Sequence, residues 1–182
     1  EVWVREARGE TFHLIQTYDF CSTSGTPGPK RKEGDLQIPE GIYYLNHFNP
    51  QSRFHLSLGV SYPNLSDRIL GDRTQPGGAI YIHGNCVTVG CIPITDAKIS
   101  ELYIMAVEAR NNGQQKIPIH IFPARLDDNG MKELLERSGD QNKNFWLNLR
   151  EIYTNFEETK KLKRISVNGE GAYVLESTSL VL

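Results

Sequence analysis

The sequence has no large excess of charge of one sign and no long hydrophobic run. Its 20 lysines and arginines nearly balance 22 aspartates and glutamates, giving a formal net charge of −2. Nucleic-acid binding relies on a basic surface, so this balance argues against a nucleic-acid partner. No apolar run approaches the roughly 18 residues that a membrane-spanning helix needs, so the sequence predicts no transmembrane span.

Cysteine is also scarce, with only Cys21, Cys86 and Cys91 present. Because three is an odd number, at least one thiol is left over in an exported protein, either free or paired between molecules. The first residue is Glu1, and no basic leader followed by an apolar segment is seen. We therefore expect that an export signal has been removed from this chain.

The residues that are present have the composition of one ordinary globular domain, with 38% hydrophobic and 23% charged residues over 182 positions. Short runs rich in Val, Ile, Tyr, Phe or Thr alternate with Gly and Pro, which predicts strands. The predicted strands are 2–4, 11–17, 42–45, 54–58, 79–82 and 117–122. Residues 21–41 carry four glycines and three prolines and predict a long loop, either ordered over a site or flexible at its tip.

Helix signals come later in the chain. Thr95 or Asp96 is placed to cap a helix whose apolar residues recur at helical spacing, and Gly113 is placed to end it. A short helix is predicted around 131–137 and a longer one over about 142–158. The apolar stripe of the longer helix is typical of a core face rather than a partner surface. The sequence thus predicts a strand-rich α+β fold.

The segment AIYIHGNCVTVGCIPITD, residues 79–96, concentrates the reactive residue types. His83, Cys86 and Cys91 are of the types that zinc prefers, but the segment has no C-x-x-C spacing. A fourth ligand would have to come from Cys21 or a distant histidine. A disulfide between Cys86 and Cys91 is within reach of such a loop and would silence thiol chemistry at Cys91.

A third interpretation is nucleophilic catalysis by Cys91 with His83 as its base. Cysteine attacks as the thiolate, whose formation is favoured by a neighbouring imidazolium or a helix N-terminus. Cys91 lies shortly before the predicted helix and follows Gly90, which permits a tight backbone path with N–H groups free for an oxyanion. The carbonyl of Gly84 is available to fix the tautomer of His83. Together, these features favour catalysis over a structural histidine and a buried cysteine.

The same segment resembles the catalytic signature of the L,D-transpeptidase (YkuD-type) family. His83-Gly84 matches the family's H-G element, and Thr88-Val89-Gly90-Cys91 is similar to its [S/T]-x-G-C element. Residues 28–45, GPKRKEGDLQIPEGIYYL, resemble an upstream family segment, and residues 54–68 resemble a stretch of the YafK-like branch. The gap between the two elements is short and the second histidine of S-H-G-C is missing, which also resembles that branch.

The resemblance covers about residues 2–123 and implies a YkuD-type core, a mixed β-sheet sandwich or barrel-like structure with a helix after the catalytic motif. We expect a catalytic domain over 1–123 and a helical C-terminal extension over 124–182, packed on the same domain. Within that extension, Asn168-Gly169 between two β-like runs predicts a hairpin.

The resemblance also implies an extracytoplasmic bacterial enzyme that acts on peptidoglycan stem peptides, with no metal or organic cofactor. Cys91 would attack the L-centre carbonyl of diaminopimelate and expel D-alanine, with His83 moving the proton and N–H groups near Gly90 and Cys91 holding the oxyanion. An amine would then take the acyl group, as in an L,D-transpeptidase. The alternatives are hydrolysis of the same type of linkage, by an L,D-carboxypeptidase, endopeptidase or amidase, and a non-catalytic cell-wall-binding module.

A substrate that carries carboxylates calls for cationic or amide groups along its groove. The candidates by position are Tyr62, Asn64, Arg73 and Lys30, and ordinary surface roles are an equal alternative for each. Asp35 and Glu40 lie beside glycine and proline, so we expect them to hold turns rather than to act as an acid/base pair.

Overall fold

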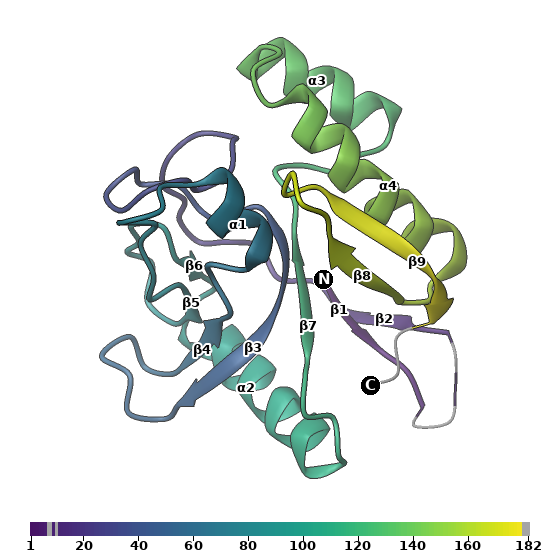
Figure 1. Cartoon of the computed structure of the whole chain (residues 1–182). Helices are drawn as coiled ribbons and strands as arrows, with labels where there is room; N and C mark the ends of the chain where they lie inside the picture. Colours follow the sequence, from purple (N-terminus) through teal and green to yellow (C-terminus); the bar gives the residue numbers. More distant parts are fainter. Residues whose placement is uncertain (7–8, 10, 180–182) are drawn as a thin grey trace. The chain divides into compact units, whose positions relative to one another are not determined.

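The computed structural model describes residues 1–6, 9 and 11–179, which fall into two compact units (Figure 1). One unit is Asp19–Ile121, and the other consists of the described residues of Glu1–Tyr18 and Phe122–Val181. The first 18 residues are thus grouped with the C-terminal segment rather than with the reactive motif. The domain boundary expected at residue 123 stays a prediction.

The unit Asp19–Ile121 is built on a five-stranded sheet with the strand order β6-β5-β4-β3-β7. Its strands are β3 (Gly41–Asn49), β4 (Ser57–Val60), β5 (Tyr81–His83), β6 (Ile92–Pro93) and β7 (Pro118–Ile121). The β5–β6 pair is parallel and the other pairs are antiparallel. This mixed sheet with its helices confirms the predicted strand-rich α+β fold.

The core of this sheet follows from apolar residues on alternating positions. Tyr43 and Leu45 of β3 are buried while Tyr44 between them is exposed, as the period of two in a strand requires. The central strand β4 is buried along its length, and its Leu58 is fully covered. Burial on both faces includes the polar Ser57, so the strand shows no alternation of buried and exposed positions.

Two strands begin later than predicted for the same physical reason. The run 54–58 becomes strand only at Ser57, and the run 79–82 only at Tyr81. His55 has φ +70° and Ala79 has φ +53°, and a left-handed backbone does not continue a strand. These two residues therefore set where β4 and β5 begin.

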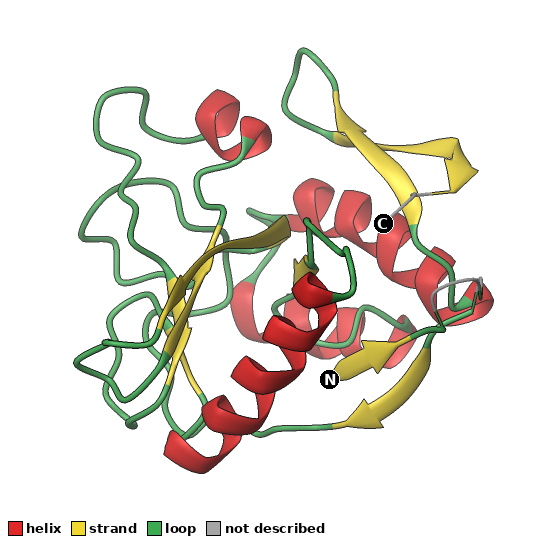
Figure 2. Ribbon diagram, turned by 90° about the horizontal axis from the view of Figure 1, so that it is seen from below, coloured by secondary structure: helices red, strands yellow, loops and turns green. Residues whose placement is uncertain are grey.

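Two helices belong to this unit. The helix predicted after the motif is confirmed as α2 (Asp96–Asn111), which has Thr95 at its N-cap and packs against β4 and β5 (Figure 2). The short helix α1 (Leu65–Leu70) was not predicted, because six residues show no apolar periodicity. It begins with a capping box between Asn64 and Asp67.

The other unit contains the two-stranded sheet of β1 (Val2–Val4) and β2 (His13–Gln16), the helices α3 (Asp128–Ser138) and α4 (Lys143–Thr159), and the hairpin of β8 (Lys163–Val167) and β9 (Tyr173–Ser179). Both predicted C-terminal helices are confirmed, and the stripe of α4 buries Trp146, Leu149 and Ile152. The hairpin turns over residues 168–172 rather than two residues, because the Asn168 N–H donates to the Ala172 carbonyl at 2.9 Å. Among the described residues no helix is long and apolar enough to cross a membrane.

Candidate active site

His83 is the last residue of β5 and is 2% exposed. Its Nδ1 atom lies 2.5 Å from the carbonyl oxygen of Gly84. A carbonyl oxygen only accepts hydrogen bonds, so in the neutral ring the proton sits on Nδ1 and Nε2 carries the free lone pair. The ring of Phe54 packs against the imidazole with centroids 4.7 Å apart. Nε2 is therefore the ring nitrogen that is positioned to take a proton.

Gly84 is required at its position for steric reasons. A Cβ atom there would lie 2.8 Å from the carbonyl oxygen of Phe54, closer than side chains tolerate. The glycine thus lets the chain turn tightly after His83 and present its own carbonyl to the ring.

Cys91 lies immediately before β6 and is a half-buried free cysteine. Its Sγ donates to the carbonyl oxygen of Ala79 at 3.6 Å. Burial raises the pKa of the thiol above its ordinary value, against the opposing effects of the Tyr81 N–H and the charge of Lys30. Burial therefore favours the thiol form of Cys91 over the thiolate.

The parallel pairing of β5 with β6 brings His83 and Cys91 onto neighbouring segments. His83 is in register with Pro93, and the Tyr81 N–H bonds the sulfur of Cys91. Alternate residues of a strand share one face, so Cys91 lies beside the β5 residue that precedes His83 on the same face. The two catalytic candidates are thus close neighbours, although neither side chain hydrogen-bonds the other among the described contacts.

The backbone on either side of the thiol is held by two hydroxyl groups. The Oγ1 of Thr88 accepts from the Cys91 N–H at 3.0 Å and donates to the Cys91 carbonyl at 2.8 Å. The Gly90 N–H donates to the Oγ of Ser24 at 2.7 Å, and Gly90 has φ +82°. The two N–H groups that the sequence offered for an oxyanion are therefore each engaged already.

Sequence reasoning missed the roles of both hydroxyls. Thr88 stands three residues before Cys91 in the motif, a spacing at which threonine side chains bond the backbone, so that signal was present. Ser24 lies 66 residues from Gly90, and no local pattern points to it.

A disulfide joins Cys21 to Cys86, with their Cα atoms 5.4 Å apart. This pairing corrects the alternative of a bond between Cys86 and Cys91, and it leaves Cys91 as the free thiol. The disulfide also removes Cys86 from a zinc site with His83 and Cys91. Within the described part of the chain, no group of three His, Cys, Asp or Glu side chains is placed to bind a metal ion.

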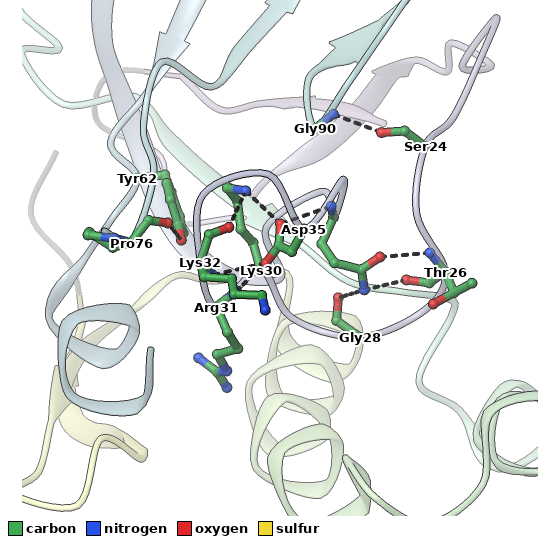
Figure 3. Close-up of polar contacts among 11 residues, drawn as sticks. Ser24, Thr26, Gly28, Lys30, Arg31, Lys32, Asp35, Tyr62, Pro76 and Gly90 are labelled. Atoms are coloured by element: carbon green, nitrogen blue, oxygen red, sulfur yellow. Dashed lines mark hydrogen bonds and ion pairs between the residues drawn. The ribbon is translucent and has the colours of Figure 1, made fainter. Parts of the chain in front are cut away.

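The loop over residues 21–41 is ordered by its own side chains (Figure 3). The carboxylate of Asp35 accepts hydrogen bonds from three backbone N–H groups, those of Arg31, Lys32 and Gln37. Burial alone would raise the pKa of Asp35, but the hydrogen bonds from Lys30 and from the backbone hold it below its ordinary value. Glu40 accepts from the Gly28 N–H at 2.6 Å. Both acidic residues thus hold turns, as expected.

Three of the four candidates for substrate binding have side chains that already form hydrogen bonds within the protein. Lys30 is buried, with its Nζ 2.6 Å from Asp35 and 2.9 Å from the Lys32 carbonyl. Tyr62 is buried, and its hydroxyl donates to the Pro76 carbonyl at 2.7 Å (Figure 3).

Burial raises the pKa of Tyr62 above its ordinary value. The side chain of Asn64 accepts from the Asp67 N–H at 3.0 Å and donates to the Ile42 carbonyl at 2.9 Å. Arg73 is exposed. A substrate-binding role stays a prediction for all four residues.

Comparison with known proteins places this chain in a family. Residues 3–121 match the YkuD family, the L,D-transpeptidase catalytic domain. The chain is 35% identical over 169 residues to the "Putative L,D-transpeptidase YafK" of Escherichia coli strain K12 and, equally, to that of strain O157:H7. The match covers 92% of this chain and 66% of each relative, so the chain spans just under two thirds of their length.

Among solved structures, the helical cell shape determining protein Pgp2 from Campylobacter jejuni is similar, with 20% identity and a TM-score of 0.40. That comparison covers 80% of this chain and 62% of the other. The family match spans more than half of the chain and includes both His83 and Cys91. This chain therefore belongs to the YkuD family of L,D-transpeptidase catalytic domains.

Proposed function

We propose that the protein is a cysteine-dependent acyltransferase of the L,D-transpeptidase type that acts on peptidoglycan stem peptides. The observation that carries the proposal is the placement of the free thiol of Cys91 on the segment next to His83, whose Nε2 is left available by the Nδ1 contact to Gly84. Family membership supplies the substrate class.

In the first half-reaction, Nε2 of His83 takes the thiol proton as Cys91 attacks the carbonyl carbon at the L-centre of diaminopimelate. The new C–S bond forms and the carbonyl becomes a tetrahedral oxyanion. The bond to D-alanine then breaks, and His83 returns the proton to the leaving amine. A base beside the thiol is needed at the moment of attack because burial keeps Cys91 protonated at rest.

In the second half-reaction, an amine attacks the thioester carbonyl and gives a proton to the same histidine. The C–N bond forms, the C–S bond breaks, and the histidine passes the proton to the departing sulfur of Cys91. If water takes its place, the same site hydrolyses the linkage, as in an L,D-carboxypeptidase, endopeptidase or amidase. The chemistry up to the thioester is shared, so the nucleophile in this step alone separates a transferase from a hydrolase.

We further propose an extracytoplasmic location. Disulfides persist in oxidising compartments such as the bacterial periplasm and are rare in the reducing cytosol. The bond between Cys21 and Cys86 fits the first setting, where peptidoglycan is also found.

The test is incubation of the protein and of Cys91→Ala with purified tetrapeptide muropeptides, followed by mass spectrometry of protein and products. We expect release of D-alanine and an acyl adduct on Cys91 in the unmodified chain, and neither in the variant. Adding an amine such as glycine separates the outcomes, because a transferase incorporates it and a hydrolase gives the free acid. Binding to sacculi with no adduct and no product would instead indicate a cell-wall-binding module.

A further inference from the structure

Acyl transfer at Cys91 needs a hydrogen-bond donor for the oxygen that becomes negative in the tetrahedral intermediate. Backbone N–H groups beside a nucleophile commonly do this, and Gly90 and Cys91 offer the nearest ones. In the structure both already donate to hydroxyl oxygens, at 2.7 Å to Ser24 and at 3.0 Å to Thr88. An oxyanion must therefore displace one of these hydroxyls or be bound by one.

The hydroxyl groups of Thr88 and Ser24 differ in whether their own protons are donated to an acceptor. Thr88 accepts from the Cys91 N–H and donates to the Cys91 carbonyl, so both of its bonding directions are used within the motif. Ser24 accepts from the Gly90 N–H, and no described residue accepts its hydroxyl proton. A hydroxyl that already accepts a hydrogen bond is polarised and donates more strongly. Ser24 thus carries a spare, activated donor next to the nucleophile.

Ser24 is also held firmly in place. Three residues before it, Cys21 is bonded covalently to Cys86. Two residues after it, the backbone of Thr26 is bound on both its N–H and its carbonyl by the side chain of Gln37 at 2.8 Å. Figure 3 shows the Ser24 side chain directed at Gly90 from this loop. Ser24 itself is half-buried. Donors fixed in advance cost no reorganisation during the reaction, which is what makes an oxyanion hole effective.

We propose that the Ser24 hydroxyl is an oxyanion donor for acyl transfer at Cys91, an assignment that rests on the proposed function. As the C–S bond forms, the carbonyl electron pair moves to oxygen, and the Ser24 O–H donates to that oxygen while keeping its own proton. When the carbonyl re-forms, the bond to the leaving group breaks and the hydrogen bond weakens. The Gly90 N–H stays on Ser24 Oγ and reinforces it throughout.

The experiment compares two reactions of the same thiol in the full chain. Alkylation by iodoacetamide needs the thiolate but forms no oxyanion, whereas acylation by p-nitrophenyl acetate passes through one. We expect Ser24→Ala to slow acylation by at least 10-fold, since losing one oxyanion donor costs on the order of 100-fold and the uncovered Gly90 N–H offsets part of this. The alkylation rate and its pH profile should stay within about twofold.

An isosteric pair and a loop control make the result specific. Ser24→Thr keeps the hydroxyl and should acylate at nearly the unmodified rate, whereas Ser24→Val has the same shape without it and should behave like Ser24→Ala. Ser22→Ala makes the same truncation in the same loop and should change neither rate. If Ser24→Ala or Ser24→Val acylates as fast as or faster than the unmodified chain, or if both reactions fall together, the assignment is overturned.

The ester assay also separates this inference from the function on which it rests. If the ester acylates Cys91 but no D-alanine is released from stem peptides, the proposed substrate is wrong. The effect of the Ser24 variants on the rate of ester acylation can still be measured in that case. A chain that the ester never acylates at Cys91 has no acyl transfer for Ser24 to assist, and this result would overturn both.

Discussion

Nδ1 of His83 contacts the carbonyl oxygen of Gly84, the residue that follows it in the chain. This contact leaves Nε2 as the basic nitrogen of a ring that is almost fully buried. The partner that needs a base is Cys91, whose thiol is kept protonated by its own burial. The two facts fit one mechanism, in which the proton moves only as the sulfur attacks.

The first prediction concerns the pH dependence of Cys91. Burial disfavours the thiolate and raises the pKa, so at neutral pH a smaller fraction is ionised than in a free cysteine. We expect the iodoacetamide rate constant to keep rising with pH beyond the point where the rate with glutathione levels off. A plateau below pH 7 would contradict this and would indicate a thiolate–imidazolium pair. His83→Asn should lower ester acylation strongly at pH 7 while leaving alkylation at high pH nearly unchanged.

The motif residues could be predicted because their signals are local. His83-Gly84 and Gly90-Cys91 stand within nine residues of one another, and the helix that follows them has its candidate cap residues, Thr95 and Asp96, directly after the motif. The contacts that complete the site are not local. Ser24 reaches Gly90 across 66 residues and Cys21 reaches Cys86 across 65, so loop closure rather than sequence pattern brings them together.

The residues at which the strands begin also could not be predicted from the sequence. Ala79 has strong neighbours of the β type, yet its left-handed backbone delays β5 to Tyr81. The carbonyl of Ala79 accepts a hydrogen bond from the Cys91 thiol, so this left-handed residue belongs to the candidate active site. Strand propensity gives no sign of this conformation, and the contact between Ala79 and Cys91 is tertiary and cannot be read from the local sequence.

A second prediction uses two glycines with nearly the same backbone. Gly90 has φ +82° and Gly34 has φ +74°, so alanine at either position is strained by about 1–2 kcal/mol. At Gly34 the added Cβ meets nothing within 4 Å, whereas at Gly90 it lies 3.2 Å from the Gln37 carbonyl. We expect both variants to unfold at lower denaturant, but only Gly90→Ala to lose most ester acylation. Equal loss of acylation in both variants would show that the effect is general destabilisation.

A third prediction concerns the disulfide between Cys21 and Cys86. It closes a loop of 65 residues, and removing such a bond costs about 2–5 kcal/mol of folding free energy. We expect Cys21→Ser/Cys86→Ser to unfold at lower urea concentration, as monitored by tryptophan fluorescence. Cys91→Ser, which leaves the bond intact, is the matched control and should unfold close to the unmodified chain. Coinciding curves for the double variant and the control would contradict the prediction.

The last prediction concerns Asp67, a carboxyl of α1 that is 2% exposed. It accepts from the Tyr43 hydroxyl at 2.9 Å and the Asn64 N–H at 3.0 Å, and Arg31 lies 3.9 Å away. Burial raises its pKa to about 6, and these partners offset the burial only in part. An unfolded aspartate titrates near 3.9, so between about pH 4 and 6 the folded state binds more protons. The contribution of Asp67 to stability is therefore present below pH 4 and is lost as pH rises through 6.

Asp67→Asn removes this titration while keeping the shape of the side chain. Measured by urea unfolding from pH 4 to 7, the unfolding free energy of the unmodified chain should fall relative to the variant by about 2–3 kcal/mol, because each unit of pKa shift corresponds to about 1.4 kcal/mol. Asp72→Asn provides a control of opposite sign, because hydrogen bonds from Gln75 and Thr74 lower the pKa of that exposed carboxyl. There the unmodified chain should lose stability relative to its variant as pH falls below 4. If the unfolding free energy of the unmodified chain relative to Asp67→Asn stays flat or rises from pH 4 to 7, the prediction is wrong. The folded protein would then favour the charged carboxylate of Asp67.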